Sequence, residues 1–409
     1  MANNKIRVGV IGVGRGQSFM QGAKHCDMEL VAICDVWKER LRDVGKRYKV
    51  ATYTEYDRFL EHDMDAVILA NYCHDHAPFA VKALDAGLHV MSECIAARTL
   101  GQCVELVEAV ERSKRIYMFA ENYPYMLGCQ ELRRVYHTGE IGDVRYAEGE
   151  YNHPGVEEWR LSLSPGVKHW RNWLPPTYYV THALAPLMYI TNTLPLSVNA
   201  LSITEKRNQA PQSMKIGDVG SVILCRMDNG AVFRIWGLGM SSIHRVRYEV
   251  HGDFGLASTM NGEVRVHHEP WMRKPGVLTD RTYNPDWPEF ADLANKAGHG
   301  GGDFWTNFHF ANAIRSGKQP YLNVYRATTM AAVSILGWKS CLQQGQNQVL
   351  PDFKKKTERN AVRDDQWSPF PEDASPGQPP ASLNGNLKPT QAVLKSAYKV
   401  WRSCGYKGK

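Results

Sequence analysis

Short apolar runs alternate with longer stretches of helical periodicity over the first third of the chain. Apolar residues recur every three to four positions in the stretches around residues 77–86 and 100–112, which predicts amphipathic helices. The runs between and before them are too short for helices and predict buried strands at residues 6–11, 28–34, 66–69, 89–92 and 116–119. Strands that alternate with helices in this way indicate an α/β fold of the Rossmann type, with a parallel sheet.

The pattern changes after Tyr125. A helix is expected at residues 129–137, and the strands that follow alternate apolar and polar residues, at 144–151, 219–227, 231–237, 245–252 and 263–268. The turn sequences Asp228-Asn229-Gly230 and Asn261-Gly262 are typical of hairpins. We therefore expect a second, α+β domain with a large, mainly antiparallel sheet, one face of which would be covered by helices 303–316 and 325–343.

This gives three parts: a dinucleotide-binding domain at residues 1–125, a substrate-binding domain at 126–345 and an extension at 346–409. The extension is rich in proline between Trp367 and Pro389. Residues 390–401 then form an amphipathic pattern, which predicts a helix that docks onto a domain or onto a neighbouring subunit.

A glycine turn follows the first strand. Gly12, Gly14 and Gly16 stand between that strand and the next helix, although the third glycine comes one position earlier than in the usual spacing. Glycines there let the backbone approach a pyrophosphate, which binds at the helix N-terminus. Asp35 ends the second strand, where a carboxylate binds a ribose diol and repels a 2′-phosphate, so NAD is favoured over NADP. The alternatives are a tight turn without a ligand and an aspartate that caps a helix.

Polar side chains gather at the carboxyl ends of the expected parallel strands. Ligands of such sheets bind at these ends, so we expect one cleft to contain His74, Asp75, His76, Glu93, Glu121 and Asn122. His76 could instead only open its helix, and Glu93 could cap a loop. Cys94 is a weak candidate for a nucleophile, because no neighbouring motif supplies its base.

Two segments of the second part combine polar and aromatic residues. One extends from His169 to Pro186, and the other is the glycine-rich run from Gly298 to Phe304. His182 stands near the start of an apolar helix, where a neutral imidazole could accept a proton, although it could also be a capping or core histidine. His299 has the same two interpretations. His267 and His268 lie on one strand without a third ligand, so no metal site is expected.

Composition narrows the possible partners. Hydrophobic residues make up 43% of the 409 residues, and the net charge of +7 is modest for this length. The one dense basic run, Lys354-Lys355-Lys356, is followed by Glu358 and is interpreted as a solvated face and not as a nucleic-acid patch. No apolar run has the length of a membrane span, and no export signal precedes the first strand. Nine cysteines without paired spacing indicate reduced thiols. We expect a cytoplasmic protein, or a periplasmic one if an export signal has been removed, that self-associates through its antiparallel sheet.

Together these motifs resemble the glucose-fructose oxidoreductase / inositol dehydrogenase / MocA family over residues 5–345. The family's Glu-Lys-Pro is replaced by Glu93-Cys94-Ile95, so the lysine that helps to move the hydroxyl proton is absent. The chain is more similar to the NAD-dependent α-N-acetylgalactosaminidases of glycoside hydrolase family 109, which also lack that lysine. The shared motifs begin at Glu93, Glu121, Glu148, Tyr179 and Gly298. The chain departs from the branch at Val180, Ala183 and Ala185 and lacks a later tyrosine, so the sugar specificity is left open.

The resemblance implies an NAD-dependent glycosidase that oxidises C3 of a sugar, eliminates the leaving group, adds water and reduces the sugar again. The alternative is a sugar or cyclitol dehydrogenase in which His182 replaces the lysine. NAD would contact the glycine turn, Asp35 and the strand ends, namely Gly12, Gly14, Arg15, Gly16, Asp35, Cys73, His74, Asp75, His76, Glu93, Cys94 and Asn122. A carbohydrate would contact Tyr151, Arg171, Tyr179, His182 and His299. His182 is the candidate base with Tyr179 beside it, and Tyr151 or Glu121 would move the C2 proton or assist the leaving group.

Overall fold

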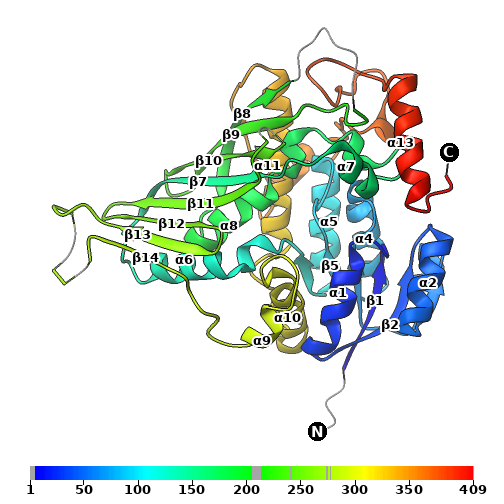
Figure 1. Ribbon diagram of the computed structural model, residues 1–409, viewed down its shortest axis with the longest axis horizontal. Coiled ribbons are helices and arrows are strands. Elements are labelled where there is room, and N and C mark those ends of the chain that lie inside the picture. Colours follow the sequence, from blue (N-terminus) through cyan, green and yellow to red (C-terminus); the bar gives the residue numbers. More distant parts are fainter. Residues whose placement is uncertain (1–4, 205–212, 240–241, 273–274, 277, 409) are drawn as a thin grey trace. The chain divides into compact units, whose positions relative to one another are not determined.

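The computed structural model describes residues 5–204, 213–239, 242–272, 275–276 and 278–408. The chain forms two compact units. The first comprises Met1–Arg134, Asn284–Ala331 and Asp352–Asp364, and the second comprises Val135–Tyr283, Ala332–Pro351 and Asp365–Lys409. Figure 1 gives the labels of the elements along the chain.

The first unit is built on a six-stranded parallel sheet in the order β3-β2-β1-β4-β5-β6. The strands are β1 (Ile6–Ile11), β2 (Met28–Cys34), β3 (Ala51–Tyr53), β4 (Ala66–Leu69), β5 (His89–Ser92) and β6 (Tyr117–Phe119). This is the Rossmann order, and the expected fold class is confirmed. The strand β3 was missed from the sequence, because its three residues are only half buried and carry no apolar run.

Helices connect these strands. They are α1 (Gly16–Ala23), α2 (Lys38–Tyr48), α3 (Tyr56–Leu60), α4 (His76–Asp85) and α5 (Leu100–Ser113). Thr99 caps α5, because its hydroxyl accepts the Gln102 N–H at 3.1 Å. The helix α4 is followed by Gly87 at a φ of 83°, a backbone conformation that favours glycine. The helices α4 and α5 pack against each other, and their small and apolar faces are buried.

Later segments of the chain complete the first unit. They include α9 (Ala291–Ala294), α10 (Gly302–Ser316), the first part of α11 (Val324–Leu342) and α12 (Lys356–Val362). The expectation that residues 303–316 cover the antiparallel sheet is wrong. The helix α10 packs against α1, and Asn307 Nδ2 donates to the Phe19 carbonyl at 3.3 Å. The aromatic residues of α10 do not indicate from the sequence which of the two domains the helix packs against.

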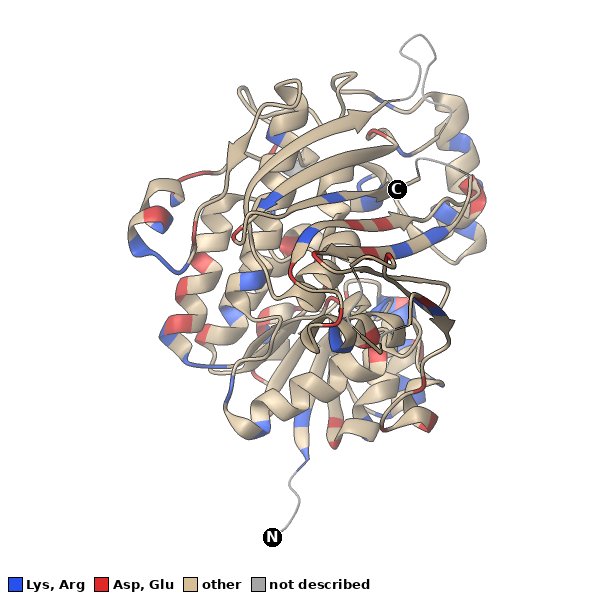
Figure 2. Ribbon diagram, turned by 90° about the vertical axis from the view of Figure 1, so that its left-hand side faces the viewer, with Lys and Arg blue, Asp and Glu red and all other residues tan. Residues whose placement is uncertain are grey.

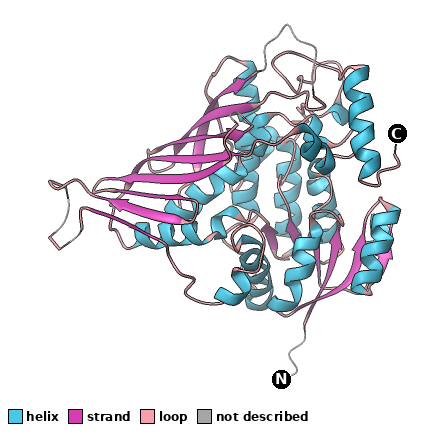
Figure 3. Ribbon diagram, in the orientation of Figure 1, coloured by secondary structure: helices cyan, strands magenta, loops and turns pink. Residues whose placement is uncertain are grey.

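The second unit contains a nine-stranded sheet in the order β14-β13-β12-β11-β7-β10-β9-β8-β15 (Figure 3). The strands are β7 (Val144–Asn152), β8 (Pro195–Ile203), β9 (Gly220–Met227), β10 (Val232–Leu238), β11 (Arg245–Gly252), β12 (Leu256–Met260), β13 (Glu263–His267), β14 (Asp280–Tyr283) and β15 (Gln348–Val349). Only β7 and β10 pair in parallel among these neighbours, so the sheet is mainly antiparallel as expected. Asp228-Asn229-Gly230 and Asn261-Gly262 form the turns between β9 and β10 and between β12 and β13.

One face of this sheet is covered by α8 (Thr181–Thr191), which lies against β7, β10 and β11. The contact is close at Gly149, where an added Cβ would come within 2.1 Å of the Ala183 carbonyl oxygen. The second part of α11 also contributes, since Ser340 accepts the Ala200 N–H of β8 at 2.9 Å. Burial of nearly all of α8 fixes the position of its first turn, where His182 stands.

The other face of the same sheet carries charged side chains in neighbouring strands. Glu148 of β7 accepts from Arg234 of β10 and Arg247 of β11, at 2.7 and 2.5 Å, and Glu150 accepts from Arg245 at 2.8 Å. Figure 2 shows the acidic and basic residues on adjacent strands. Such cross-strand pairs keep this face polar, whereas alternate residues of β7 point to α8.

The terminal helix of the extension packs within the second unit, one of the two placements expected for it, whereas residues 352–364 belong to the first unit. The helix α13 (Gln391–Ser403), capped by Thr390, packs against α7 (Glu157–Leu163), and the two lie side by side in Figure 1. The Trp401 indole is fully buried and donates to the Leu161 carbonyl at 3.0 Å. The proline-rich segment is also held, because the Trp338 indole donates to the Pro380 carbonyl at 2.9 Å.

Several strands of the second unit have no strong apolar pattern, and β8, β12, β14 and β15 were missed. The bounds of α6 (Leu127–His137) agree with expectation to within two residues.

Among the described residues, none of the helices combines the length and apolar character of a membrane span.

Candidate active site

The glycine turn has the geometry that a dinucleotide needs. Gly12 has a φ of 91°, and an added Cβ would lie 2.2 Å from the Ala70 carbonyl oxygen. At Gly16 a Cβ would lie 2.7 Å from Val10, so glycine lets α1 approach the sheet. At Gly14 the nearest atom to a Cβ is 4.0 Å away, which leaves that backbone open to a ligand. Gly16 therefore performs the packing role of the third glycine despite its early position.

Asp35 follows β2 and organises the turn. Its carboxylate accepts the Val13 N–H and the Trp37 N–H, both at 2.8 Å. A carboxylate offers about four acceptor positions, so these two bonds leave room for a ribose diol. The aspartate stands before α2, which begins only at Lys38, and binds the backbone of the glycine turn and of the segment that precedes this helix.

Asn71 provides a test of whether the unit fits a cofactor. Its side-chain Nδ2 and Oδ1 are buried and have no hydrogen-bond partner in the described part of the chain. Buried amide groups normally have partners, so both atoms are placed to bind a polar ligand at the end of β4. The open Gly14 backbone, the Asp35 carboxylate and this amide together fit NAD.

The segment after Asn71 is compact. Cys73, His74 and Asp75 form a short 3-10 turn, and His76 begins α4. The His76 ring lies 2.9 Å from the Ile95 carbonyl oxygen and 3.3 Å from the Asn71 carbonyl oxygen. Burial lowers the pKa of His76 more than these carbonyls raise it, which favours the neutral ring. His76 thus joins the ends of β4 and β5 in addition to opening its helix.

A charge network around the buried Asp303 carboxylate fixes the loop between β1 and α1. Arg15 Nε donates to Glu93 at 2.6 Å, and its two terminal nitrogens donate to Asp303 at 3.0 and 2.7 Å. Asn122 donates to Asp303 at 2.8 Å, and the His299 ring lies 2.9 Å from the same carboxylate. The network joins residues from four separate segments of the sequence.

The charges in this network determine the protonation of its members. Burial alone would raise the pKa of Asp303, but hydrogen bonds from His299 and Arg15 outweigh it and hold that pKa well below its usual range. Burial would lower the pKa of Arg15, but Glu93 and Asp303 raise it above the ordinary value. Asp303 therefore stays a carboxylate and Arg15 stays a cation.

Cys94 donates its thiol to the buried Glu121 carboxylate, at 3.1 Å between Sγ and Oε2. Glu121 also accepts the Tyr123 N–H at 3.3 Å. The peptide bond between Cys94 and Ile95 is cis. The hydrogen bond to Glu121 gives the Cys94 thiol a defined orientation.

The second unit brings three predicted residues together through their rings. The ring of His182 lies edge-on to Tyr151 and Tyr179, with centroid distances of 4.7 and 5.0 Å, and Tyr151 lies 5.9 Å from Tyr179. Tyr248 donates its hydroxyl to the His182 carbonyl at 2.5 Å. His182 and Tyr151 are each 8% exposed, so this cluster is packed as well as polar.

Arg171 and Trp170 extend this cluster. The guanidinium of Arg171 lies 4.4 Å from the centroid of the Trp170 ring and 5.7 Å from that of Tyr179, and Trp170 stacks on Tyr179 at 6.0 Å. These cation–aromatic contacts hold the guanidinium of Arg171 beside the ring cluster. His299, also predicted to contact the sugar, belongs to the first unit and lies beside Asp303.

The sequence interpretation gave no individual role to Asn71, Asp303 or Trp170. Asp303 lies in the glycine-rich run that drew attention to His299, so its position was signalled without its partners. His267 and His268, to which no metal role was given, contact Asp280 and the Phe254 carbonyl respectively, at 3.5 and 2.9 Å.

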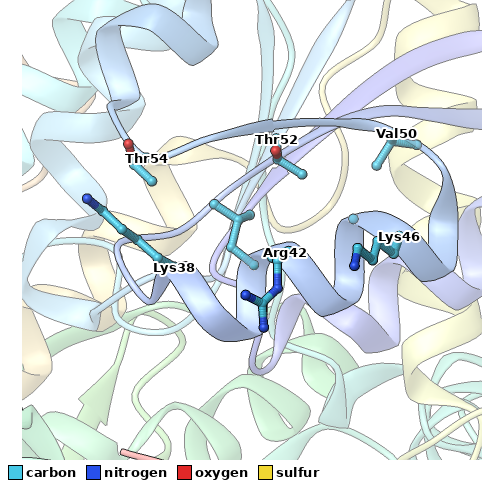
Figure 4. Close-up of a pocket in the computed structure, with 8 residues that line it drawn as sticks. Lys38, Arg42, Lys46, Val50, Thr52 and Thr54 are labelled. Atoms are coloured by element: carbon cyan, nitrogen blue, oxygen red, sulfur yellow. The ribbon is translucent and has the colours of Figure 1, made fainter. Parts of the chain in front are cut away.

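A shallow hollow lies elsewhere on the first unit, between α2 and the region of β3 (Figure 4). It is lined by Lys38, Leu41, Arg42, Gly45, Lys46, Val50, Thr52 and Thr54. Its three cations follow one exposed side of α2 at four-residue spacing. None of the predicted site residues lines it.

Two segments of the chain match known protein families. Residues 6–121 match the family described as "Oxidoreductase family, NAD-binding Rossmann fold", and residues 195–359 match "Glycosyl hydrolase 109, C-terminal domain". The first segment is therefore similar to NAD-binding Rossmann domains of the Gfo/Idh/MocA type, and the second is similar to the C-terminal domain of glycosyl hydrolase 109. The resemblance to these two groups is confirmed, and NAD is the cofactor.

Two curated proteins with similar sequences carry the name glycosyl hydrolase family 109. A glycosyl hydrolase family 109 protein of Solibacter usitatus is 25% identical, with 86% of this chain and 89% of the relative covered. Glycosyl hydrolase family 109 protein 1 of Akkermansia muciniphila is 26% identical, with coverages of 86% and 82%.

Solved structures share the fold. A levoglucosan dehydrogenase in complex with NADH has a TM-score of 0.73 at 19% identity, with 85% of this chain and 100% of that chain covered. An aldose-aldose oxidoreductase from Caulobacter crescentus has a TM-score of 0.69 at 18% identity, with the same coverages. The two family matches and the curated relatives, and not the shared fold, show that the protein is an enzyme, either a glycosidase or an NAD-dependent oxidoreductase.

Proposed function

We propose that this protein is an NAD-dependent glycosidase that cleaves its substrate through transient oxidation at C3 of the sugar. The observation that carries this proposal is the glycosyl hydrolase 109 C-terminal domain, joined to a Rossmann domain with Cys94 in place of the dehydrogenase lysine. When bound, NAD+ accepts hydride from C3 and later returns it. Such enzymes are exceptions to the two-carboxylate route of most glycosidases.

The unit that carries His182 supplies the proton chemistry at C3. His182 is the proposed base for the C3 hydroxyl, because Tyr151 and Tyr179 hold its ring edge-on and α8 fixes its backbone. Arg171, Tyr151 and Tyr179 are proposed to bind the sugar hydroxyls. His299 is proposed as a further sugar contact.

A ketone at C3 makes the C2 proton acidic, so the bond to the leaving group can break by elimination. Removal of this proton and protonation of the leaving group are assigned to Tyr151 or Glu121. Glu121 is held by Cys94 and by the Tyr123 N–H, which favours a fixed carboxylate. Addition of water to the unsaturated ketone then gives the hydrolysed sugar after re-reduction at C3.

The proposed cofactor contacts are those predicted from the sequence, with Asn71 added. Gly12, Gly14 and Gly16 would hold the pyrophosphate, and Asp35 the adenosine ribose. The two buried Asn71 amide atoms support the proposal that its side chain binds the nicotinamide half.

The alternative is an NAD-dependent sugar or cyclitol dehydrogenase in which His182 replaces the lysine. The similarity in fold to the levoglucosan dehydrogenase favours this second candidate. Both candidates use the same base, but they differ in whether the hydride is returned to the sugar.

One assay separates them. The enzyme is incubated with nitrophenyl glycosides and a trace of NAD+, and both phenol release and absorbance at 340 nm are followed. A glycosidase releases many phenol equivalents per NAD+ without accumulating NADH. NADH that increases in step with consumed sugar would overturn the glycosidase proposal in favour of the dehydrogenase.

A further inference from the structure

Beyond the three rings at His182, the second unit carries another aromatic group that the proposed function does not use. It consists of His153, Trp159 and His244, and we call it the outer shelf. His153 comes directly after β7, Trp159 lies in α7, and His244 precedes β11. None of the three belongs to the motifs that carry the family resemblance.

The outer shelf is continuous with the catalytic rings. The His153 ring lies 5.7 Å from the Tyr151 ring, which in turn lies 4.7 Å from His182. Trp159 stacks on His153 at 5.2 Å with an interplanar angle of 2°, and His244 meets His153 edge-on at 4.6 Å. Ring contacts therefore lead stepwise from His182 to Trp159.

Burial decreases along this path. His182 and Tyr151 are 8% exposed, whereas Trp159 is 41% exposed although it is a large apolar side chain. Its indole is nevertheless held in place, because a Cβ at Gly155 would come within 2.3 Å of the ring. An ordered and open indole beside a buried reaction centre is a feature of a binding surface.

The chemistry of the shelf suits a sugar ring. An indole face offers an apolar surface for the C–H groups of a pyranose, and imidazole nitrogens offer donors and acceptors for hydroxyls. Burial lowers the pKa of His153, and the nearby His244 lowers it further, so His153 favours the neutral ring. A neutral ring at His153 suits contact with the hydroxyls of an uncharged ligand.

We infer that the outer shelf is the subsite for the leaving-group part of the substrate, and that it binds a second sugar ring on Trp159. This inference rests on the proposed function and adds a substrate class to it: glycosides whose leaving group is itself a sugar. Glycosides with a small leaving group would use the Tyr151, Tyr179 and His182 rings without the shelf.

The test compares two substrates of the same glycon on the holoenzyme, a methyl glycoside and a disaccharide. The measured quantity is the ratio of kcat/KM for the disaccharide to kcat/KM for the methyl glycoside. Trp159→Ala should lower this ratio roughly fivefold to tenfold through KM, which is the value of one aromatic stacking contact.

Gly155→Ala gives an independent check, because its methyl group would displace the indole without removing it. We expect it to lower the ratio in the same direction. Trp271→Ala is the matched control, since Trp271 is 77% exposed on the turn after β13, three strands away from β7 in the sheet. The control should leave the ratio unchanged.

The outcomes are distinct. If the wild type cleaves both substrates and Trp159→Ala keeps the wild-type ratio, the subsite is overturned while the proposed function stands. The second outcome concerns a panel of common hexose and N-acetylhexosamine substrates, each tested as methyl glycoside and as disaccharide. If the wild type cleaves none of them, both the proposed function and the subsite are refuted.

Discussion

The candidate site residues of the first unit and those of the second unit are held in place by different kinds of interaction. In the first unit, Arg15, Glu93 and Asp303 are held by charged hydrogen bonds of 2.6 to 3.0 Å. In the second unit, Tyr151, Tyr179 and His182 meet mainly through ring faces and edges. Charge pairs fix a geometry for a cofactor of constant shape, whereas ring contacts build an aromatic wall beside the proposed base. Variants should therefore affect stability and cofactor binding in the first unit, and chemistry in the second.

The largest effect is expected at His182. His182→Asn should keep the fold and NAD binding but lower turnover roughly a hundredfold to ten-thousandfold, because the base is lost. Single-turnover formation of NADH at 340 nm measures the hydride step directly. Tyr248→Phe, which removes only the bond to the His182 carbonyl, serves as the control and should change the rate far less. Reduction of NAD+ at the normal rate in His182→Asn would mean that His182 is structural.

The buried network of the first unit should respond through stability. Asp303→Asn keeps the shape of the side chain and removes its charge, which should lower the free energy of unfolding by about 3 kcal/mol. Urea unfolding at pH 7 measures this. The matched control is Asp280→Asn, which breaks an exposed ion pair with Arg265 and should have a much smaller effect. Equal losses in both variants would contradict the importance of the buried network.

The same variant has a predictable dependence on pH. The pKa of Asp303 is lowered in the folded protein, so its stabilisation is fully present above the ordinary carboxyl pKa of about 3.9. It is lost as the pH falls from there toward the lowered pKa. The stability difference between the wild type and Asp303→Asn should therefore shrink below about pH 4. A difference that grows with acidity would contradict this assignment.

A smaller effect is expected for Asp35. Asp35→Ala should weaken NAD binding roughly tenfold and reduce the preference over NADP, because hydrogen bonds to the ribose and repulsion of a 2′-phosphate are both lost. Calorimetric titration with each cofactor measures both changes. Asp35→Asn, which keeps an acceptor for the backbone, should bind NAD better than the alanine variant does. An unchanged preference for NAD in both variants would refute the role of Asp35.

The smallest effect is expected at Cys94. Cys94→Ser keeps a donor to Glu121 and should be close to the wild type, and Cys94→Val should lose less than about tenfold in turnover because only one hydrogen bond disappears. Steady-state kinetics with nitrophenyl glycosides measures both. A loss of about a thousandfold in the valine variant, ~4 kcal/mol of barrier, would instead indicate a chemical role for the thiol.

The two halves also differ in how far the sequence predicts them. The strands and the glycine turn of the first unit follow from short-range apolar patterns, so the positions of Gly12, Asp35 and Glu93 at strand ends could be predicted. The partner of Arg15 could not, because Asp303 is separated from it by 288 positions and no periodic pattern links them. Likewise, the motif around Tyr179 drew attention to His182, but only folding brings Tyr151 to its ring. Short or half-exposed strands such as β3 and β15 were missed, because neighbours and not local pattern stabilise them.

The packing of α13 on α7 has a consequence for how substrate preference can change. Trp401 of α13 donates to the carbonyl of Leu161 in α7, and Trp159 lies on the same short helix as Leu161. Residues 391–403 fall outside both segments that match known families, and they carry none of the proposed catalytic groups. Substitutions there could shift α7, and with it the leaving groups that are accepted, while the bond-breaking chemistry stays intact. Substitutions in the C-terminal helix could thus change substrate specificity, in evolution or in the laboratory, without changing the catalytic residues.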